Sequence, residues 1–163
     1  KEMVAKILPS ASLEKHYPIA FNLIPQIDVF LDNLYTKEEM KMINETQKIM
    51  EDYDMRITAT TVRVPVYRSH SESVNIEFEN DLELADMIKA IEAFPGVQML
   101  DNPQAQEYPM PLFLAGKDPV YVGRIRKDIT NPNGILMWIV GDQIKKGAAL
   151  NAVQILELLI EGK

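Results

Sequence analysis

Apolar and polar positions along the chain follow two periods, and the first clear helical period runs from Thr36 to about Glu51. Thr36 and Glu39 have the spacing of a capping box, which satisfies backbone amides at the start of a helix. Before this helix, residues 18–33 are expected to form a buried extended or looped segment, and residues 1–18 show a short helical tendency. The side chains expected to face inward from the helix are Met40, Ile43, Gln47 and Met50.

A period of two, which is typical of strands, follows the helix. It predicts one strand over residues 56–66 and a second over residues 73–79. The alternation stops between them, at residues 67–71, so a bend or bulge is expected there. The side chains expected on one face are Val62, Val64 and Val66 in the first strand, and Val74, Ile76 and Phe78 in the second.

Helices and strands are predicted in turn over the second half of the chain. A helix over 83–94, closed by Pro95 and Gly96, leads into a strand over 97–100. After a proline-rich loop, strands are expected over 121–128 and 135–140, and the NPNG sequence between them has strong turn chemistry. The chain then forms a helix that is expected to lie in the core, because apolar residues have helical spacing at Ala149, Ala152, Val153, Leu156, Leu159 and Ile160.

Composition narrows the classes of protein to which the chain can belong. Its 163 residues suffice for one domain with a core, and 47% of them are hydrophobic. The absence of cysteine excludes disulfides, a thiolate metal site and a cysteine nucleophile within the chain. A net charge of −7 argues against nucleic-acid binding. No apolar run has the length of a membrane span and no signal peptide opens the chain, so a cytoplasmic protein is expected.

Arg63 and His70 are the first candidates for chemistry. Arginine holds a carboxylate at two points, and histidine moves protons near neutral pH. Their separation of seven residues would place them on opposite faces of a continuous strand, so a common site requires the break between them. The alternative is an arginine on a strand edge and a histidine facing solvent.

Three further clusters have both a functional and a structural interpretation. Glu38 and Lys41 lie three residues apart on the first helix. Together they could bind a zwitterion or a phosphorylated acid; the structural alternative is an exposed ion pair. The glycine-bounded turn over 141–149 could bind an anion at the start of a helix. The structural alternative is that its small residues let a helix pack closely on the sheet. Arg124 and Arg126 share one strand face, and they suit a small anion or a charged surface.

Taken together, the chain resembles the bacterial aspartate-semialdehyde dehydrogenases. The resemblance rests on separated blocks in one order, which is more specific than any single motif. They are HYPIAFNLIPQIDVF (16–30), EEMKMINETQKIM (38–50), TTVRVPVYRSHSESVNIEFE (60–79), VGRIRKD (122–128) and GDQIKKGAALNAVQ (141–154).

The resemblance implies an enzyme that reduces aspartyl 4-phosphate to aspartate semialdehyde with NADPH and releases phosphate, on the route to lysine, methionine, threonine and isoleucine. By position in the family's motifs, Arg63 holds the substrate carboxylate and His70 is the acid/base. Glu38 meets the substrate amine, and Lys41 meets phosphate or substrate. Gln143 lies near the NADP cofactor. A homodimer is also implied.

The same resemblance places the nucleophilic cysteine and the nucleotide-binding domain of the family upstream of the matched blocks. Residues 1–163 are therefore expected to be a single catalytic and dimerisation domain that is inactive alone. Its expected fold is α+β, a mixed sheet with helices packed on one face and the other free to pair with a second subunit, like the C-terminal domain of glyceraldehyde-3-phosphate dehydrogenase-like enzymes. The alternatives are a noncatalytic dimerisation module and a related acyl-phosphate reductase, against which Glu38 argues.

Overall fold

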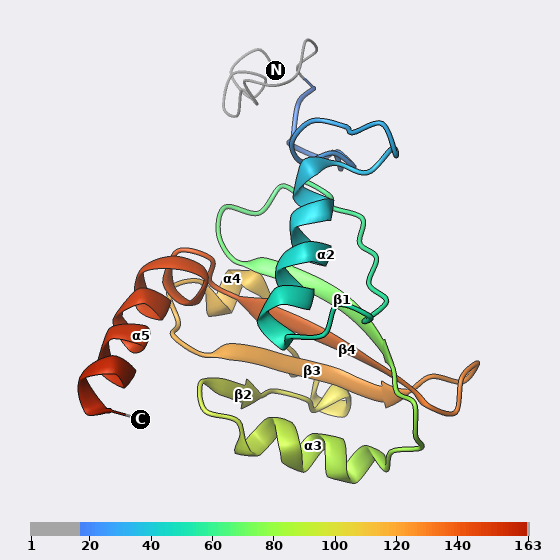
Figure 1. Cartoon of the computed structure of the whole chain (residues 1–163), viewed down its shortest axis with the longest axis vertical. Helices are drawn as coiled ribbons and strands as arrows, with labels where there is room; N and C mark the ends of the chain where they lie inside the picture. The colour runs from blue at the N-terminus through green and yellow to red at the C-terminus, as the bar shows by residue number, and fades with distance from the viewer. Residues whose placement is uncertain (1–16, 163) are drawn as a thin grey trace. The chain divides into compact units, whose positions relative to one another are not determined.

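The computed structural model describes residues 17–162, and its backbone divides into one unit that ends at Pro65 and another that begins at Val66. Figure 1 labels the helices and strands of both units. The helical tendency expected over residues 1–18 falls almost wholly on residues 1–16, which lie outside the described residues.

Helix α2, Lys37–Met50, is the regular element of the first unit, and it begins at the predicted capping box. The Thr36 backbone amide donates to Oε2 of Glu39 at 2.8 Å, and the Glu39 amide donates to Oγ1 of Thr36 at 3.2 Å. Met40, Ile43 and Gln47 are half-buried as predicted, whereas Met50 in the last turn is exposed. The helix ends at Glu51, which has a φ of +56°.

The strand predicted over residues 56–66 is wrong. In place of a ladder, this segment forms an isolated bridge in which Arg63 and Ile24 exchange hydrogen bonds of 2.8 and 3.0 Å. The Thr61 amide donates to a side chain, that of Glu39, where a strand residue would donate to a neighbouring strand. Alternation of apolar and polar residues in the sequence favours an extended backbone, but it does not indicate whether a partner strand is present.

The segment over residues 18–33 is looped, as predicted, but it is not buried. Phe21 and Leu23 are exposed, and so are Val29, Phe30 and Leu31. One amphipathic helix offers too little apolar surface to cover such a segment, so its large side chains remain on the surface of the unit.

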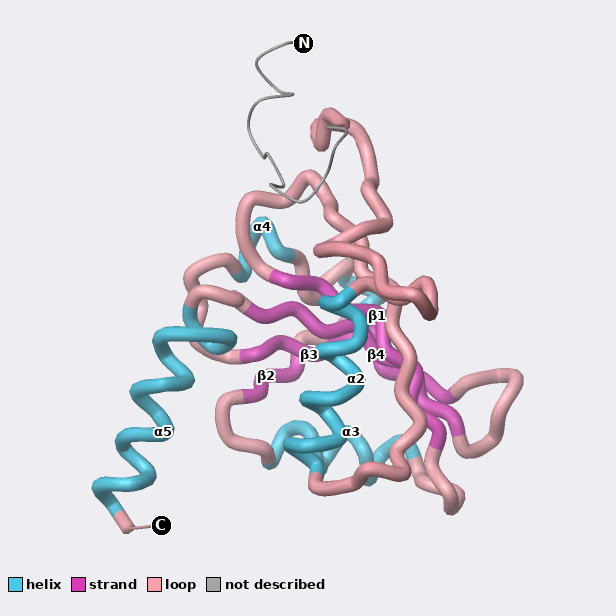
Figure 2. Tube along the Cα trace, turned by 45° about the horizontal axis from the view of Figure 1, so that its top comes forward, coloured by secondary structure: helices cyan, strands magenta, loops and turns pink. Residues whose placement is uncertain are grey.

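A mixed four-stranded sheet forms the centre of the second unit, with strand order β1-β4-β3-β2 (Figure 2). Its pairs β1–β4 and β3–β4 are antiparallel, while β2–β3 is parallel. The strands confirm the predictions made from residue 73 onward, apart from small differences at their ends. They are β1, His70–Glu77; β2, Val97–Met99; β3, Val120–Lys127; and β4, Gly134–Gly141.

Helix α3, Leu84–Ala93, packs on one face of this sheet and closes the core. Val122, Ile135 and Met137 are buried in the sheet beneath it, with Ile135 completely inaccessible. From the helix, the packed side chains are Leu84, Met87, Ile88 and Ile91. The predicted α+β fold, a mixed sheet with a helix layer, is confirmed.

The loop between β2 and β3 meets the opposite face of the sheet and contains a 3₁₀ turn, Pro103–Ala105, and the short helix α4, Pro111–Leu114. The indole Nε1 of Trp138 donates to the carbonyl of Pro109 at 2.9 Å. Gly123 is required beside this contact, because a Cβ atom there would overlap Leu100 and Pro109. The register of β3 slips just after Gly123, at Arg124, whose φ is +54°.

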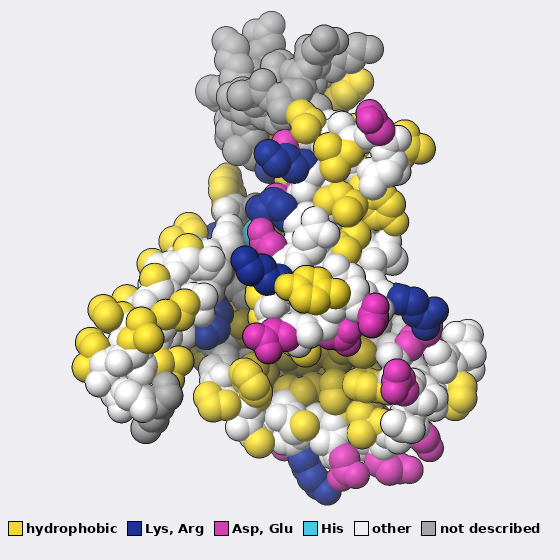
Figure 3. Space-filling view, in the orientation of Figure 1, with side chains coloured by type: hydrophobic (Ala, Val, Ile, Leu, Met, Phe, Trp, Pro, Cys, Tyr) yellow, Lys and Arg dark blue, Asp and Glu magenta, His cyan; other side chains and the backbone are white. Residues whose placement is uncertain are grey.

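The C-terminal helix forms where it was predicted, but it is not a core helix. After a π-helical turn, Lys145–Ala149, helix α5 spans Leu150–Glu161 and projects beside the sheet (Figures 1 and 2). Apolar side chains cover its visible surface (Figure 3), and Leu159 and Ile160 are each 76% exposed. Helical spacing of apolar residues predicts a helix with an apolar face. Whether that face is buried depends on the other elements of the protein.

Candidate functional site

Glu38 and Lys41 lie on one face of α2, where Nζ of Lys41 is 3.1 Å from Oε2 of Glu38. Their side chains are 36% and 49% exposed, so the pair stays accessible to a ligand. The hydrogen bond and charge of Glu38 raise the pKa of Lys41, which keeps its ammonium charged. As a stabilising contact such a surface pair contributes little, typically below about 1 kcal/mol.

Glu39, between these two residues, ties α2 to the segment that carries Arg63. Its Oε1 accepts a hydrogen bond from the Thr61 amide at 2.8 Å, and its Oε2 accepts from Thr36. These backbone hydrogen bonds, first from Thr36 and then from Thr61, lower the pKa of this carboxyl, which is only 6% exposed. Arg63 follows two residues after Thr61 and is half-buried, with its backbone bridged to Ile24.

His70 begins strand β1 in the second unit and pairs with Gly141, at the end of β4. The alternation along β1 puts His70 on the same face as Val74 and Ile76, at the margin of the sheet. Its side chain is exposed. The predicted break lies immediately before it, since Ser69 has a φ of +82°.

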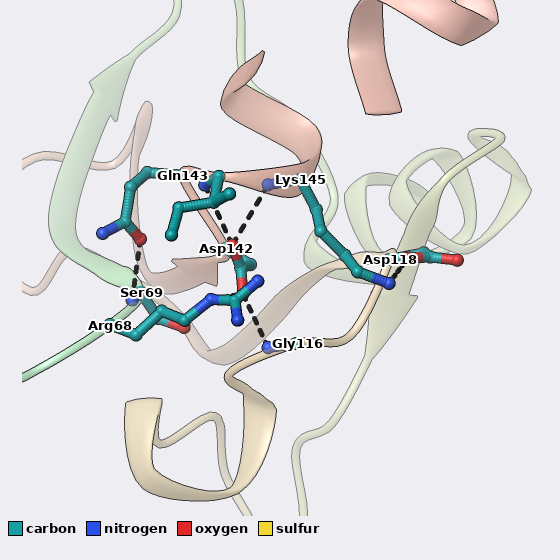
Figure 4. Close-up of polar contacts among 8 residues, drawn as sticks. Arg68, Ser69, Gly116, Asp118, Asp142, Gln143 and Lys145 are labelled. Carbon is teal, nitrogen blue, oxygen red and sulfur yellow. Dashed lines mark hydrogen bonds and ion pairs between the residues drawn. The ribbon is translucent and has the colours of Figure 1, made fainter. Parts of the chain in front are cut away.

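Gln143 lies two residues beyond Gly141, the residue with which His70 pairs. Its Oε1 accepts a hydrogen bond from the backbone amide of Ser69 at 2.7 Å (Figure 4). The amide NH₂ of the same side chain remains as a donor. A donor of this kind fits the carboxamide or phosphate oxygens of a nicotinamide nucleotide.

Asp142 and Arg68 are contributors that motif reading passed over. Nε of Arg68 lies 2.6 Å from Oδ2 of Asp142, whose side chain is completely buried. Burial alone would raise the pKa of Asp142. Hydrogen bonds from backbone amides, together with Arg68, outweigh it and lower the pKa to about 2. In the sequence, an aspartate after a glycine is typical of a turn. Only the burial of its carboxylate in the structure distinguishes Asp142 from an ordinary turn residue.

The predicted site residues thus fall into two local groups. In the first unit, the contact between Glu39 and Thr61 holds the helix turn of Glu38 and Lys41 beside the segment of Arg63. In the second unit, the contact between Ser69 and Gln143 holds Gln143 beside His70. A common pocket for both groups stays a prediction.

One cavity in each unit lies away from these residues. One of about 250 Å³ in the first unit is lined by residues that include Phe30, Tyr35 and Glu39, without Glu38, Lys41 or Arg63. One of about 340 Å³ in the second unit lies between Gly96 and α5, without His70 or Gln143. Over residues 17–162, no helix combines the length and apolar character that crossing a bilayer requires.

Comparison with known proteins shows which family the chain resembles. A family model described as semialdehyde dehydrogenase, dimerisation domain, matches residues 2–146. Aspartate-semialdehyde dehydrogenase of Bacillus subtilis is 51% identical over 160 residues, which is 98% of this chain and 46% of that protein. The enzyme of the same name from Aquifex aeolicus is 50% identical over 156 residues, 96% of this chain and 46% of the relative. The chain therefore spans less than half the length of these relatives.

Solved structures agree with the sequence matches. Aspartate semialdehyde dehydrogenase II from Vibrio cholerae, complexed with ASA, superposes with a TM-score of 0.84 at 46% identity, over 89% of this chain and 43% of that one. The Candida albicans enzyme with NADP gives a TM-score of 0.70 at 25% identity, over 87% of this chain and 45% of that one. With a family model that matches most of its length and relatives about half identical to it, the chain belongs to the semialdehyde dehydrogenase family and corresponds to its dimerisation domain.

Proposed function

We propose that this chain provides the substrate-binding and dimerisation part of an NADP-dependent aspartate-semialdehyde dehydrogenase. The whole enzyme converts L-aspartyl 4-phosphate to aspartate 4-semialdehyde and releases phosphate, a step toward lysine, methionine, threonine and isoleucine in the cytoplasm. The observation that carries the proposal is about 50% identity, over 96–98% of the chain, to relatives of that name.

The substrate head is held by residues of the first unit. Arg63 binds the carboxylate of the substrate as a two-point fork, and Glu38 accepts hydrogen bonds from its ammonium group. Lys41 supplies positive charge to the phosphate. The support is local geometry, because the Glu38 carboxylate and the Lys41 ammonium are adjacent, partly exposed and of opposite charge.

Proton transfer and cofactor contact belong to the second unit. His70, exposed at the start of β1, is the acid/base that serves the reacting group. The amide NH₂ of Gln143 contacts NADP, which supplies the hydride when bound and is held mainly by the rest of the enzyme. The chain holds no cysteine, so the thiolate nucleophile also comes from elsewhere and the chain alone is inactive.

The test is a chimera in which the portion of the Bacillus subtilis enzyme that this chain does not match is joined to this chain. The chimera is expected to reduce NADP in the presence of aspartate semialdehyde and phosphate, the reverse reaction, as followed by NADPH absorbance. His70→Ala is expected to lower kcat by at least about a hundredfold, the usual contribution of an acid/base group. Arg63→Ala is expected to lower kcat/KM by a similar factor, because a charged contact to the substrate is lost.

Lys89→Ala is the matched control for these variants. Lys89 forms an exposed ion pair with Asp86 at the same three-residue spacing and the same 3.1 Å distance as Glu38 and Lys41. It is expected to leave activity unchanged. A folded chimera without activity, or one whose activity survives both Arg63→Ala and His70→Ala, contradicts the proposed roles.

A noncatalytic dimerisation module is the second candidate. The absence of cysteine and the description of the matching family model as a dimerisation domain favour it. The two functions separate in the same chimera. A stable dimer that never gains dehydrogenase activity supports the module, and NADPH formation that depends on His70 supports the enzyme.

A further inference from the structure

Ser69 is a strained residue placed immediately before His70. Its φ of +82° lies in the left-handed region, which residues with a side chain rarely adopt. Ser69 is also buried, with 7% of its surface exposed. Such a conformation persists only where surrounding contacts determine it, and strain of this kind gathers at functional sites.

Two contacts on consecutive residues hold this strained turn. The Ser69 amide donates to Oε1 of Gln143 at 2.7 Å, and Arg68 forms its ion pair with Asp142 at 2.6 Å. Figure 4 shows both reaching from the residues before β1 to the residues after β4. His70, the next residue, pairs with Gly141, which directly precedes Asp142. Three successive residues on one side therefore meet three successive residues on the other.

Asp142 is itself anchored on several sides, so it provides a fixed point. Its Oδ2 accepts from the Gly116 amide at 2.6 Å, at the end of the loop that holds α4. Its Oδ1 accepts from the amides of Ile144 and Lys145 at 2.9 and 3.1 Å, at the start of the π-helical turn. The carboxylate thus joins two backbone segments, the Gly116 loop and the start of the π-helical turn, to Arg68.

The His70 imidazole, by contrast, makes no hydrogen bond or ion pair within residues 17–162. What the fold fixes for this side chain is therefore the backbone from which it leaves, and with it the direction of the Cα–Cβ bond. We propose that Gln143 and Asp142, the latter through Arg68, are positioning residues that fix this backbone and hence aim the His70 imidazole. The inference rests on the proposed acid/base role of His70, and it gives Gln143 a task separate from contact with NADP.

The two tasks of Gln143 use different atoms, which makes them separable by substitution. Positioning uses the acceptor Oε1, whereas cofactor contact uses the NH₂ donor. Gln143→Glu keeps an acceptor for the Ser69 amide and removes the donor. Gln143→Ala removes both. A positioning role therefore predicts rescue by glutamate, and a role confined to cofactor contact predicts none.

The experiment measures amide hydrogen exchange and histidine ring signals by NMR on the 163-residue chain. His16→Asn in every sample leaves His70 as the only imidazole. In Gln143→Ala, the Ser69 amide is expected to exchange about tenfold faster, since it loses its acceptor, and the ring signals of His70 are expected to shift and broaden. In Gln143→Glu, both are expected to stay close to those of the parent chain.

The matched control is Lys145→Ala, in the same turn, which removes only the exposed ion pair of Lys145 with Asp118. It is expected to change neither signal. Slow exchange at Ile135 and Val140 reports that the sheet remains folded. Should Gln143→Ala fail to fold, Gln143→Met keeps the volume without a good acceptor and replaces it.

Unchanged Ser69 exchange in Gln143→Ala overturns the proposal, and so does a Gln143→Glu variant that behaves like Gln143→Ala. In the chimera, the steady-state kinetics of Gln143→Ala and Gln143→Glu give a second readout. A loss of His70 positioning is expected to change kcat and its pH profile more than KM for aspartate semialdehyde. The NMR result requires no catalysis. A chimera that proves inactive therefore rejects the proposed function while the contact between Gln143 and Ser69 is still tested.

Discussion

Glu39 and Asp142 are buried carboxylates that hold candidate site residues in place. Glu39 joins α2 to the segment of Arg63, and Asp142 joins the π-helical turn to the residue pair before His70. Each accepts hydrogen bonds from backbone amides, and each has a lowered pKa for that reason. Their carboxylates are used in the fold, while the side chains of Glu38, Lys41 and His70 remain accessible to solvent.

The pKa of Asp142 predicts a pH dependence of stability. Its pKa falls from 3.8 to about 2 on folding, so the unfolded chain binds this proton more readily. The carboxylate therefore stabilises the fold fully above about pH 4, and this contribution is lost as the pH falls toward 2. Urea unfolding across this range should show a steeper loss of stability for the parent chain than for Asp142→Asn.

Asp86→Asn is the control for that measurement, because Asp86 is an exposed aspartate paired only with Lys89 on the surface. It should retain the slope of the parent chain. Equal slopes for Asp142→Asn and the parent chain would show that the buried carboxylate does not contribute to the acid response.

Glu38→Gln tests recognition of the substrate amine in the chimera. Glutamine keeps the size of the side chain but removes the charge that the ammonium group meets. KM for aspartate semialdehyde is expected to rise about tenfold or more, the usual cost of losing a charged hydrogen bond, with a smaller effect on kcat. An unchanged KM in steady-state kinetics would reject this role and would favour a related acyl-phosphate reductase.

At the scale of elements, the N-terminus of α2 is where local sequence and site geometry coincide. Thr36 is completely buried and caps the helix turn that carries Glu38, Glu39 and Lys41. Thr36→Ala is expected to lower the free energy of unfolding by about 1 kcal/mol or more, because the capping hydrogen bond is lost. Urea denaturation of the chain measures this change.

Thr46→Ala, on the exposed side of the same helix, is the control. Its hydroxyl bonds back to the Met42 carbonyl at 2.6 Å, and alanine is the better helix former at such a position. Its stability is expected to equal or exceed that of the parent chain. Equal losses in both variants would mean that capping is not what Thr36 contributes.

Elements with local signals were predicted well, and those that depend on distant partners were not. The β3–β4 hairpin follows from two alternating runs and the NPNG turn, and α2 follows from its capping box. Residues 56–66 alternate equally well, but their hydrogen bonds go to Glu39 and Ile24 instead of to a strand. The helical spacing of α5 predicted a helix correctly and its burial wrongly, because nothing local reports what covers a face.

The candidate site divides along the same line. Arg63, His70, Glu38 and Lys41 were candidates from residue type and spacing, and the resemblance of the motif order to a family gave them roles and added Gln143. The bond from Ser69 to Gln143 joins residues 74 apart, and no short pattern encodes it. Arg68 and Asp142 both lie within the sequence blocks that carry the family resemblance, but their ion pair is evident only in the structure.

At the scale of the molecule, the chain combines a net charge of −7 with many exposed apolar side chains. Because the matching family model describes a dimerisation domain, the chain is expected to form a homodimer that buries part of this apolar surface. Sedimentation equilibrium should give twice the chain mass. The value should be insensitive to salt, because burial of apolar surface and not charge drives the association.

Leu136→Glu tests whether the sheet face opposite α3 takes part. Leu136 is half-buried on that face, beside Trp138 in the alternation of β4. A charge there is expected to dissociate the dimer, whereas Ala90→Glu, at an exposed position of α3 on the other side of the sheet, is expected to leave it intact. A monomeric parent chain, or dimers that survive Leu136→Glu, would contradict a dimer built on this face.

The proposed roles are tested most directly by a crystal structure of the active chimera with aspartate semialdehyde bound. Arg63 and Glu38 are expected to contact the carboxylate and the amine of one ligand molecule at hydrogen-bond distance, about 3 Å. The His70 imidazole is expected to face the aldehyde of that ligand, and Lys41 is expected to line the same pocket. A ligand bound without Arg63 and His70, or these side chains found on separate surfaces, would contradict these roles.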